Sequence, residues 1–170
     1  MIGNKALYFG MIALVFGLCS GVVSNAQSAT AATKSGLQPG QASGALTVGD
    51  STVKLSNAGV FVDKKDERKP TVLLLSDQEL PLSGWADSSD MIMYRMDHKF
   101  NGVAFWLDDK NQVFRTEFYM PGQFPAGATG MFELKLDAGK SLSGAAVSTA
   151  AAAKQSDPIK LDVRFNGAVK

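Results

Sequence analysis

His98 is the residue of this chain best suited to acid–base chemistry, and it is the only histidine among the 170 residues. Imidazole titrates near neutral pH, and a serine and a carboxylate complete the triad of serine hydrolases. Asp97 adjoins His98, but no Gly-x-Ser-x-Gly turn is present to expose a nucleophilic serine. A hydrolase that uses His98 with a serine and a carboxylate is therefore kept as an alternative, and no catalytic residue is assigned.

The sequence Gly139-Lys140-Ser141 has the ending of a phosphate-binding loop. That motif needs a glycine five residues before its last glycine, where this chain has Leu134 inside an alternating segment. We expect an ordinary hairpin turn there. One cysteine and one histidine also cannot supply a zinc site of the usual His/Cys type. The sequence predicts neither a metal nor a cofactor.

The charge of the chain is nearly balanced, with a formal net charge of +1. Its densest charged run, residues 63–69, holds four basic and three acidic side chains, which is typical of a solvated loop tip. Nucleic-acid binding requires an unbalanced basic surface with stacking aromatics. We therefore expect no nucleic-acid partner.

Aromatic residues concentrate between Phe100 and Phe124, where seven of the twelve aromatics beyond residue 26 occur. Residues 102–107 and 113–120 flank a loop rich in turn formers and should pair as a hairpin. Alternation assigns one side of the hairpin to the core: Val103, Phe105, Leu107, Phe114, Phe118 and Met120. It leaves Trp106, Arg115 and Tyr119 on the other side, with an indole–guanidinium contact possible.

An outward Trp beside Tyr and Arg has the composition of a binding hot spot. Phe124 extends this candidate surface, because it lies in the loop 121–130, which holds two prolines and three glycines. We name Trp106, Arg115, Tyr119 and Phe124 as candidate binding residues. The alternative is that a helix or a chain terminus covers this face and the aromatics serve packing.

Alternation of apolar and polar residues dominates the rest of the chain, and it is clearest in residues 132–137 and 159–166. Residues 71–75 are apolar at both parities, as in a strand covered on both faces. Further strands are predicted at the following segments: 45–48, 53–55, 59–62 and 142–149. Strands at this spacing, separated by turn formers, indicate an antiparallel sandwich or barrel-like domain of about eight strands.

Residues 83–98 break the alternating pattern. Ser88, Ser89 and Asp90 are suited to cap a helix, while Ile92 and Met96 have helical spacing. The same stretch also fits a strand, because Ile92, Tyr94 and Met96 alternate. We favour one short helix near 83–98 that lies across one end of the sheet.

The first 26 residues have the organisation of a signal peptide. Lys5 precedes a 13-residue apolar run from Ala6 to Leu18, which is too short for a transmembrane helix, and small residues lead to Ala26. We predict cleavage after Ala26 and no membrane span in the mature chain. Lipidation at Cys19 is not expected, because Leu18 stands where lipoprotein signals carry a small residue.

Residues 27–43 contain one large apolar side chain, Leu37, and read as a flexible low-complexity linker. The β domain then extends over residues 44–170. Without its first 26 residues the chain has no cysteine and equal numbers of acidic and basic residues. Such a domain must be stabilised by its hydrophobic core alone.

The segments SGALTVGDSTVKLSNAGVFV, TVLLLSD and FNGVAFWLDDKNQVFRTEFYMPG carry a resemblance. Together they resemble small exported bacterial β-domain proteins of unknown function, whose domain opens with a Gly-x-Leu-Thr-Val strand. The resemblance covers most of residues 44–137. It implies a periplasmic or secreted bacterial protein, and it implies no catalytic residue.

These observations lead to one preferred function and three alternatives. We expect an exported, non-enzymatic β domain that binds an envelope protein or a small apolar ligand. The alternatives are the hydrolase built on His98, a structural envelope protein without a ligand, and a closed barrel with an interior ligand cavity. The sequence leaves the oligomeric state open.

Overall fold

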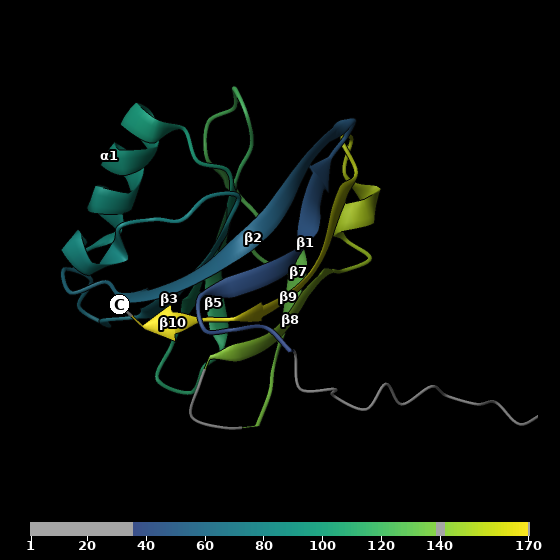
Figure 1. Ribbon diagram of the computed structural model, residues 1–170. Helices are drawn as coiled ribbons and strands as arrows, with labels where there is room; N and C mark the ends of the chain where they lie inside the picture. The colour runs from purple at the N-terminus through teal and green to yellow at the C-terminus, as the bar shows by residue number, and fades with distance from the viewer. Residues whose placement is uncertain (1–35, 139–141, 170) are drawn as a thin grey trace, which may run out of the picture. The chain divides into compact units, whose positions relative to one another are not determined.

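The fold is described from a computed structural model, which covers residues 36–138 and 142–169. The predicted signal peptide, the linker up to residue 35 and Gly139-Lys140-Ser141 lie outside these residues. In chain order the elements are β1 (Gln41–Val48), β2 (Ser51–Val62), β3 (Thr71–Ser76), η1 (Leu82–Gly84), α1 (Ser88–His98), β4 (Gly102–Leu107), β5 (Val113–Tyr119), β6 (Ala126–Gly127), β7 (Phe132–Leu136), β8 (Ser143–Ser148), η2 (Ala152–Lys154), β9 (Ile159–Asn166) and β10 (Ala168–Val169) (Figure 1).

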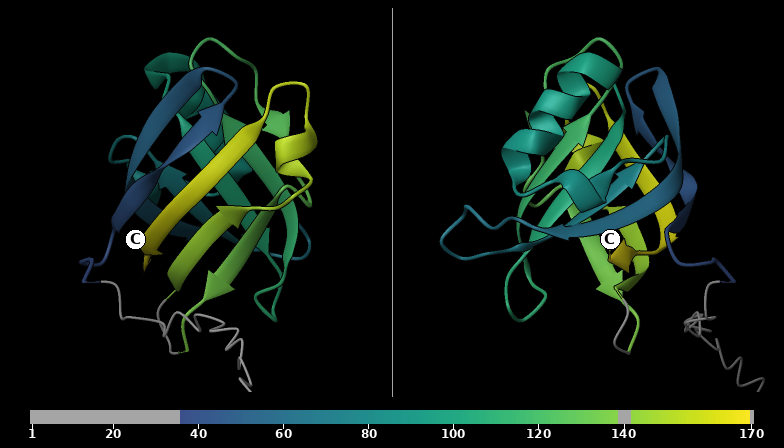
Figure 2. Two further views of the ribbon diagram at one scale, coloured as in Figure 1. Left: turned by 90° about the vertical axis from the view of Figure 1, so that its right-hand side faces the viewer. Right: turned by 60° about the vertical axis from the view of Figure 1, so that its left-hand side comes forward.

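All ten strands belong to one sheet, in the order β6-β5-β4-β3-β2-β1-β9-β8-β7, with the short β10 beside β2. Neighbours in this order are antiparallel, whereas β10 and β2 are parallel. The sheet curls into a half-barrel (Figure 2). The prediction of a mainly β, barrel-like antiparallel domain is confirmed. Within the described residues β6 and β7 do not pair, so the alternative of a closed barrel is not formed there.

The strand predictions from alternation agree closely with the structure. The segment 159–166 is β9, and 132–137 corresponds to β7. The separately predicted strands 53–55 and 59–62 are one continuous strand, β2, because its first half pairs with β1 and its second half with β3. β1 begins at Gln41, so three residues of the expected linker belong to the first strand.

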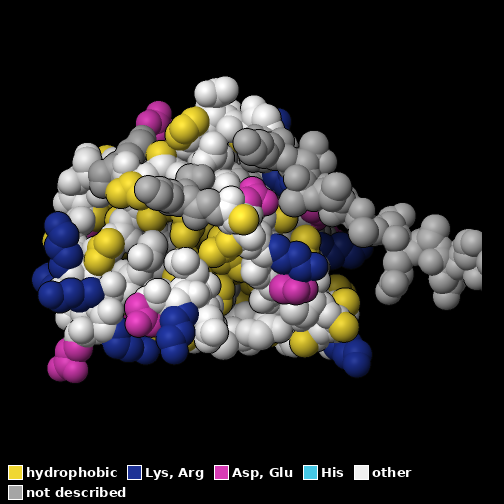
Figure 3. Space-filling model, turned by 90° about the horizontal axis from the view of Figure 1, so that it is seen from below, with side chains coloured by type: hydrophobic (Ala, Val, Ile, Leu, Met, Phe, Trp, Pro, Cys, Tyr) yellow, Lys and Arg dark blue, Asp and Glu magenta, His cyan; other side chains and the backbone are white. Residues whose placement is uncertain are grey.

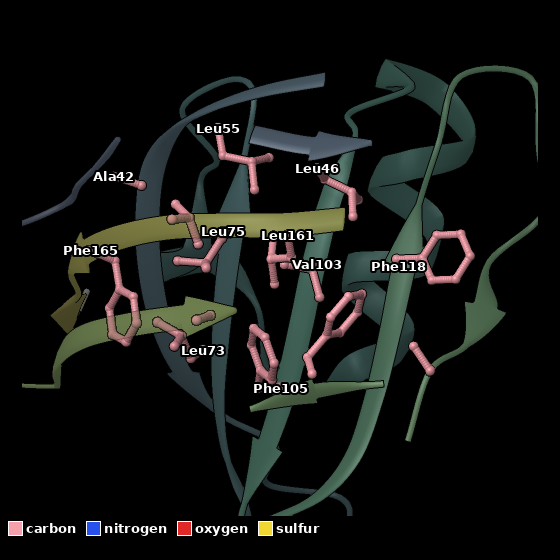
Figure 4. Close-up of a cluster of buried hydrophobic side chains, with 14 of the residues drawn as sticks. Ala42, Leu46, Leu55, Leu73, Leu75, Val103, Phe105, Phe118, Leu161 and Phe165 are labelled. Atoms are coloured by element: carbon pink, nitrogen blue, oxygen red, sulfur yellow. The ribbon is translucent and has the colours of Figure 1, made fainter. Parts of the chain in front are cut away.

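The inner face of the half-barrel holds the larger hydrophobic core. Its side chains come from most strands of the sheet and point toward one another (Figure 4). On β4 the predicted inward residues Val103, Phe105 and Leu107 are buried in this core. The ring of Phe105 meets that of Phe132 edge-on at a centroid distance of 6.2 Å, which brings β4 and β7 together across the open side of the sheet.

One predicted core residue of β5 lies on the other face. Phe118 and Met120 belong to the inner core as expected, but Phe114 packs against the outer cluster. The register shifts by one residue there: Trp106 pairs with Arg115 and Leu107 pairs with Val113, which leaves Phe114 without an opposite residue. Such a β-bulge reverses the direction of every side chain that follows it.

A second core covers the outer face of β2 to β5. It contains Phe61, Trp85, Met91, Phe100 and Trp106, among other residues. The segment 77–100, including α1, packs onto this face instead of crossing the end of the sheet (Figure 2). β3 is buried on both faces, as its apolar residues at both parities predicted.

α1 covers residues 88–98 of the helix predicted near 83–98, while residues 82–84 form the separate helix η1. Asp87 is the N-cap of α1, and its carboxylate accepts a hydrogen bond from the Ser89 amide, while Asp90 accepts from the Asp87 amide. This capping box satisfies amides that have no partner within the helix. Lys65, from the loop after β2, forms an ion pair with Asp87.

The loop after β2 is more than a solvated tip. Asp63 is 7% exposed, and its carboxylate accepts hydrogen bonds from the amide and the hydroxyl of Ser88, at the start of α1. It also accepts from the amides of Lys65 and Asp66. The expectation that residues 63–69 form a solvated loop tip is wrong at Asp63, because charge-assisted hydrogen bonds fix this part of the loop to α1.

We expect the acid sensitivity of the fold to depend on Asp87. The hydrogen bonds from Lys65 and Ser89 hold the pKa of this carboxyl well below its usual range. A carboxyl whose pKa is lowered in the folded state stabilises the fold at pH values above its ordinary pKa of about 3.9. This stabilisation is lost as the pH falls further. Asn keeps the capping geometry without the charge. Asp87→Asn should therefore lower the urea midpoint at pH 6, with a difference from the parent that shrinks toward pH 3.

The control for this measurement is Asp109→Asn, at an exposed carboxylate in the loop between β4 and β5. Its urea midpoint should follow the parent at both pH values. An Asp87→Asn variant whose deficit is the same at pH 6 and pH 3 would contradict the proposed role of the charge.

Candidate functional site

His98 lies in the last turn of α1. Its ring stacks on Tyr94 at a centroid distance of 4.0 Å, and Nδ1 lies 3.2 Å from the Tyr94 carbonyl oxygen. Ser88 and Ser89 are at the opposite end of the helix, about 15 Å away at 1.5 Å per residue. Among the described residues no serine hydroxyl or carboxylate forms a hydrogen bond with the imidazole.

Trp106 is not the outward-facing side chain that the preferred interpretation required. The indole is 1% exposed and lies beneath the start of α1, where its Nε1 donates to the Ser88 hydroxyl at 3.1 Å. The prediction that it contacts Arg115 is confirmed, because the guanidinium carbon lies 4.3 Å from the centre of the ring. The alternative that a helix covers this face describes Trp106 correctly.

Tyr119 is also buried, in the same outer core. Its hydroxyl donates to Glu117 at 3.0 Å, and burial raises the pKa of the phenol strongly. Arg115 remains partly exposed, but its guanidinium donates to Glu117 and stacks on the indole of Trp106. Three of the four candidate residues therefore have packing partners within the domain.

Phe124, the fourth candidate, is 93% exposed. It follows a β-turn, Met120–Gln123, which has Pro121 at its second position and Gly122 at its third. The Gln123 amide donates to the Met120 carbonyl at 3.2 Å, and Gly122 has a φ of +70°. Type II turns place a positive φ at the third position, which favours glycine. A defined turn therefore presents Phe124 to solvent.

Arg95 of α1 fixes this turn to the helix. One of its terminal nitrogens donates to the carbonyl of Met120 at 2.9 Å and to that of Gln123 at 3.1 Å. The guanidinium also lies over the ring of Tyr119, 5.3 Å from its centre. The loop and the helix are thereby held at a constant separation, and sequence spacing alone gave no indication of this contact.

Between α1 and the loop lies a groove of about 430 Å³, which we call the α1 groove. Its lining is largely apolar and comes from one helix face and one loop: Ile92, Arg95, Met96, Gly122, Gln123, Phe124 and Pro125. This volume is within the range of small-molecule sites. Apart from Phe124, none of these residues is among the binding residues predicted from the sequence. The available signal was the four-residue spacing of Ile92 and Met96, which places both on one face of a helix.

A second hollow, of about 460 Å³, opens at the lower end of the half-barrel. Figure 3 shows hydrophobic side chains in this depression as seen from below. Val60, Leu136 and Leu142 line it, but so do Thr71 and Asp137. Its lining mixes apolar and polar side chains. We therefore take the α1 groove as the candidate functional site.

Comparison with known proteins gave no relative. The chain matches no protein-family model, and neither curated proteins nor solved structures gave a match.

In the described part of the chain, no three His, Cys, Asp or Glu side chains are grouped so as to hold a metal ion. No helix within residues 36–138 and 142–169 has the length and hydrophobicity needed to span a bilayer.

Proposed function

We propose that the protein is an exported, non-enzymatic β domain that binds an apolar segment of an envelope partner, or a small apolar ligand, in the α1 groove. The observation that carries the proposal is where the exposed hydrophobic side chains lie. Among the described residues six large ones are exposed, and four of them lie on α1 or in the loop after β5: Ile92, Met93, Met96 and Phe124. The remaining two, Val62 and Val169, lie on other elements.

Exposing these four apolar side chains to water is unfavourable, because each of them forgoes the stabilisation that burial would provide. Contiguous apolar surface on a folded domain is typical of interaction sites. Methionine suits such a surface, since its unbranched, polarisable side chain adapts to different partners. The Arg95 hydrogen bonds support the same conclusion, because a loop already fixed in place loses little entropy on binding.

The compartment in this proposal follows from the first 26 residues of the sequence. A cleaved signal peptide would place the domain in the periplasm or outside the cell. Removal of 26 of the 170 residues leaves a chain of 144 residues that begins at Gln27. The proposal therefore includes two readouts, the mass of the mature protein and the binding capacity of its groove.

Both readouts are available from one preparation. The full chain is produced in a bacterial host and recovered from the envelope fraction, where the expected intact mass is that of residues 27–170. The purified protein is then titrated with 1-N-phenylnaphthylamine, a neutral dye that fluoresces in apolar sites. We expect saturable binding, and Met96→Gln should weaken it about 5- to 10-fold through lost apolar contact.

Val62→Gln is the matched control, because it removes an exposed hydrophobic side chain outside the groove. It should bind the dye as the parent does. Phe124→Ser should weaken binding in the same way as Met96→Gln. Equal dye affinity in all four proteins would overturn the proposed site, and an uncleaved, cytoplasmic chain would overturn the proposed compartment.

A further inference from the structure

The helix face that lines the α1 groove combines two kinds of side chain. Ile92, Arg95, Met96 and Lys99 are spaced i, i+3, i+4 and i+7, so they form one row along α1 and its C-cap. At 1.5 Å per residue the row is about 10.5 Å long. Ile92 stands at one end of this row and Lys99 at the other, with Arg95 and Met96 between them. The groove therefore runs from an apolar end at Ile92 to a cationic end at Lys99.

A smaller hollow, separate from the one at the lower end of the half-barrel, continues the α1 groove toward Lys99. It has a volume of about 320 Å³. It shares Arg95, Met96, Gly122 and Gln123 with the α1 groove, while Lys99 and Asn101 line only the smaller hollow. The two hollows therefore adjoin along the same helix face. An elongated ligand lying in the groove would reach both.

The charge of this surface is unbalanced. The residues lining the two hollows include the cations Arg95 and Lys99 and no carboxylate. Within residues 36–138 and 142–169, neither cation forms an ion pair. The hydrogen bonds of Arg95 go to carbonyl oxygens, which do not neutralise its charge. A negatively charged group would therefore complement the Lys99 end.

Asn101 adds an unused polar atom to the same end. Its side-chain nitrogen donates to Asp77 at 2.7 Å, whereas its Oδ1 is buried and accepts no hydrogen bond within the described part of the chain. Buried acceptors usually have a donor. Among the described residues this acceptor has no donor, and its residue lines the hollow beside Lys99.

We propose that the α1 groove binds a free single-chain amphiphile, a fatty acid whose acyl chain lies along Ile92, Met96 and Phe124 and whose carboxylate lies near Lys99. This inference rests on the proposed function and specifies its ligand class. The apolar side chains of Ile92 and Phe124 at one end of the groove, with Lys99 at the other, favour one chain with a terminal anion. The lining itself contributes no carboxylate, and the neighbouring Asp77 accepts hydrogen bonds from the backbone and side-chain amides of Asn101.

The test compares ligands that differ only in the head group. Decanoate and 1-decanol, at pH 8 and below the critical micelle concentration of decanoate, are used to displace 1-N-phenylnaphthylamine from the mature protein. We expect decanoate to bind more tightly than decanol, and added NaCl should weaken only the binding of decanoate. Met96→Gln should weaken both ligands.

Lys99→Asn isolates the head-group contact. Lys99 has a φ of +51°, and Asn tolerates this left-handed conformation, so the end of the helix is retained. The substitution should lower the affinity for decanoate about 2- to 5-fold, the effect of one exposed ion pair, and leave that for decanol unchanged. Lys110→Asn, in the loop between β4 and β5, is the matched control and should change neither affinity.

The outcomes separate the two proposals. Equal affinities for decanoate and decanol, both reduced by Met96→Gln, would overturn the fatty-acid assignment and leave the apolar groove intact. Displacement by neither ligand, with dye binding insensitive to Met96→Gln, would overturn the groove itself. Retention on phosphatidylglycerol vesicles without any displacement by decanoate would assign the surface to a membrane and overturn the free ligand.

Discussion

Trp106→Ala is expected to lower the free energy of unfolding by about 3–5 kcal/mol, the usual cost of removing a large buried aromatic side chain. The indole is 1% exposed and lies between β4 and α1. Its loss would leave a cavity beneath the first turn of the helix and remove the hydrogen bond to Ser88. Arg115 would also lose the ring on which it stacks. Urea unfolding followed by circular dichroism measures this effect.

Trp106→Phe separates packing from hydrogen bonding in the same measurement. Phe retains most of the aromatic area but lacks the indole N–H, so a smaller loss, of about 1–2 kcal/mol, is expected. A recognition role for an exposed Trp106 predicts the opposite pattern, with stability nearly unchanged in both variants. An unfolding midpoint of Trp106→Ala within error of the parent would contradict the buried position.

Gly102→Ala should be strongly destabilising, with a loss of about 3 kcal/mol or more. A Cβ built on Gly102 would lie 2.0 Å from the carbonyl oxygen of Leu75 and 3.1 Å from the Cα of Ser76. Both are backbone atoms of β3, which is itself paired on both sides. Overpacking costs 1–3 kcal/mol where side chains can move aside, and the backbone of a central strand cannot do so.

Gly84→Ala is the matched control, because no atom lies within 4 Å of the position that its Cβ would take. Its stability should stay within about 0.5 kcal/mol of the parent, as is usual for exposed positions. Similar losses in Gly84→Ala and Gly102→Ala would show that the loss of glycine flexibility, and not the contact between β3 and β4, is responsible.

Much of the sheet was predictable because successive side chains in a regular strand point to opposite faces of the sheet. The alternation in residues 159–166 matches β9 residue for residue, and the apolar segment 71–75 is a strand buried on both faces. The contact between Trp106 and Arg115, which the expected hairpin made possible, also joins directly paired residues. Such features involve neighbouring residues or directly paired strands, whose geometry is nearly fixed.

The candidate site was only partly predictable. Of the four proposed residues, Phe124 lines the α1 groove, whereas Trp106 and Tyr119 are buried below α1. Trp106 and Tyr119 lie on the predicted face of the hairpin, and the error arises because α1 covers that face.

The sequence by itself determined the local patterns: the strands, the hairpin, a helical segment near 83–98 and a neutral chain after residue 26. It also identified the aromatic residues that had to be either buried or used for binding. It did not determine which of the two applies, because exposure depends on segments that are distant in the chain.

Only the tertiary structure decided that α1 covers Trp106 and that Arg95 fixes the turn at Gly122 beside Met96. The groove joins residues 92–96 to residues 122–125, and no periodicity extends across that separation. Burial of the outer face of the sheet stabilises this arrangement, and it leaves Ile92, Met96 and Phe124 exposed at its edge.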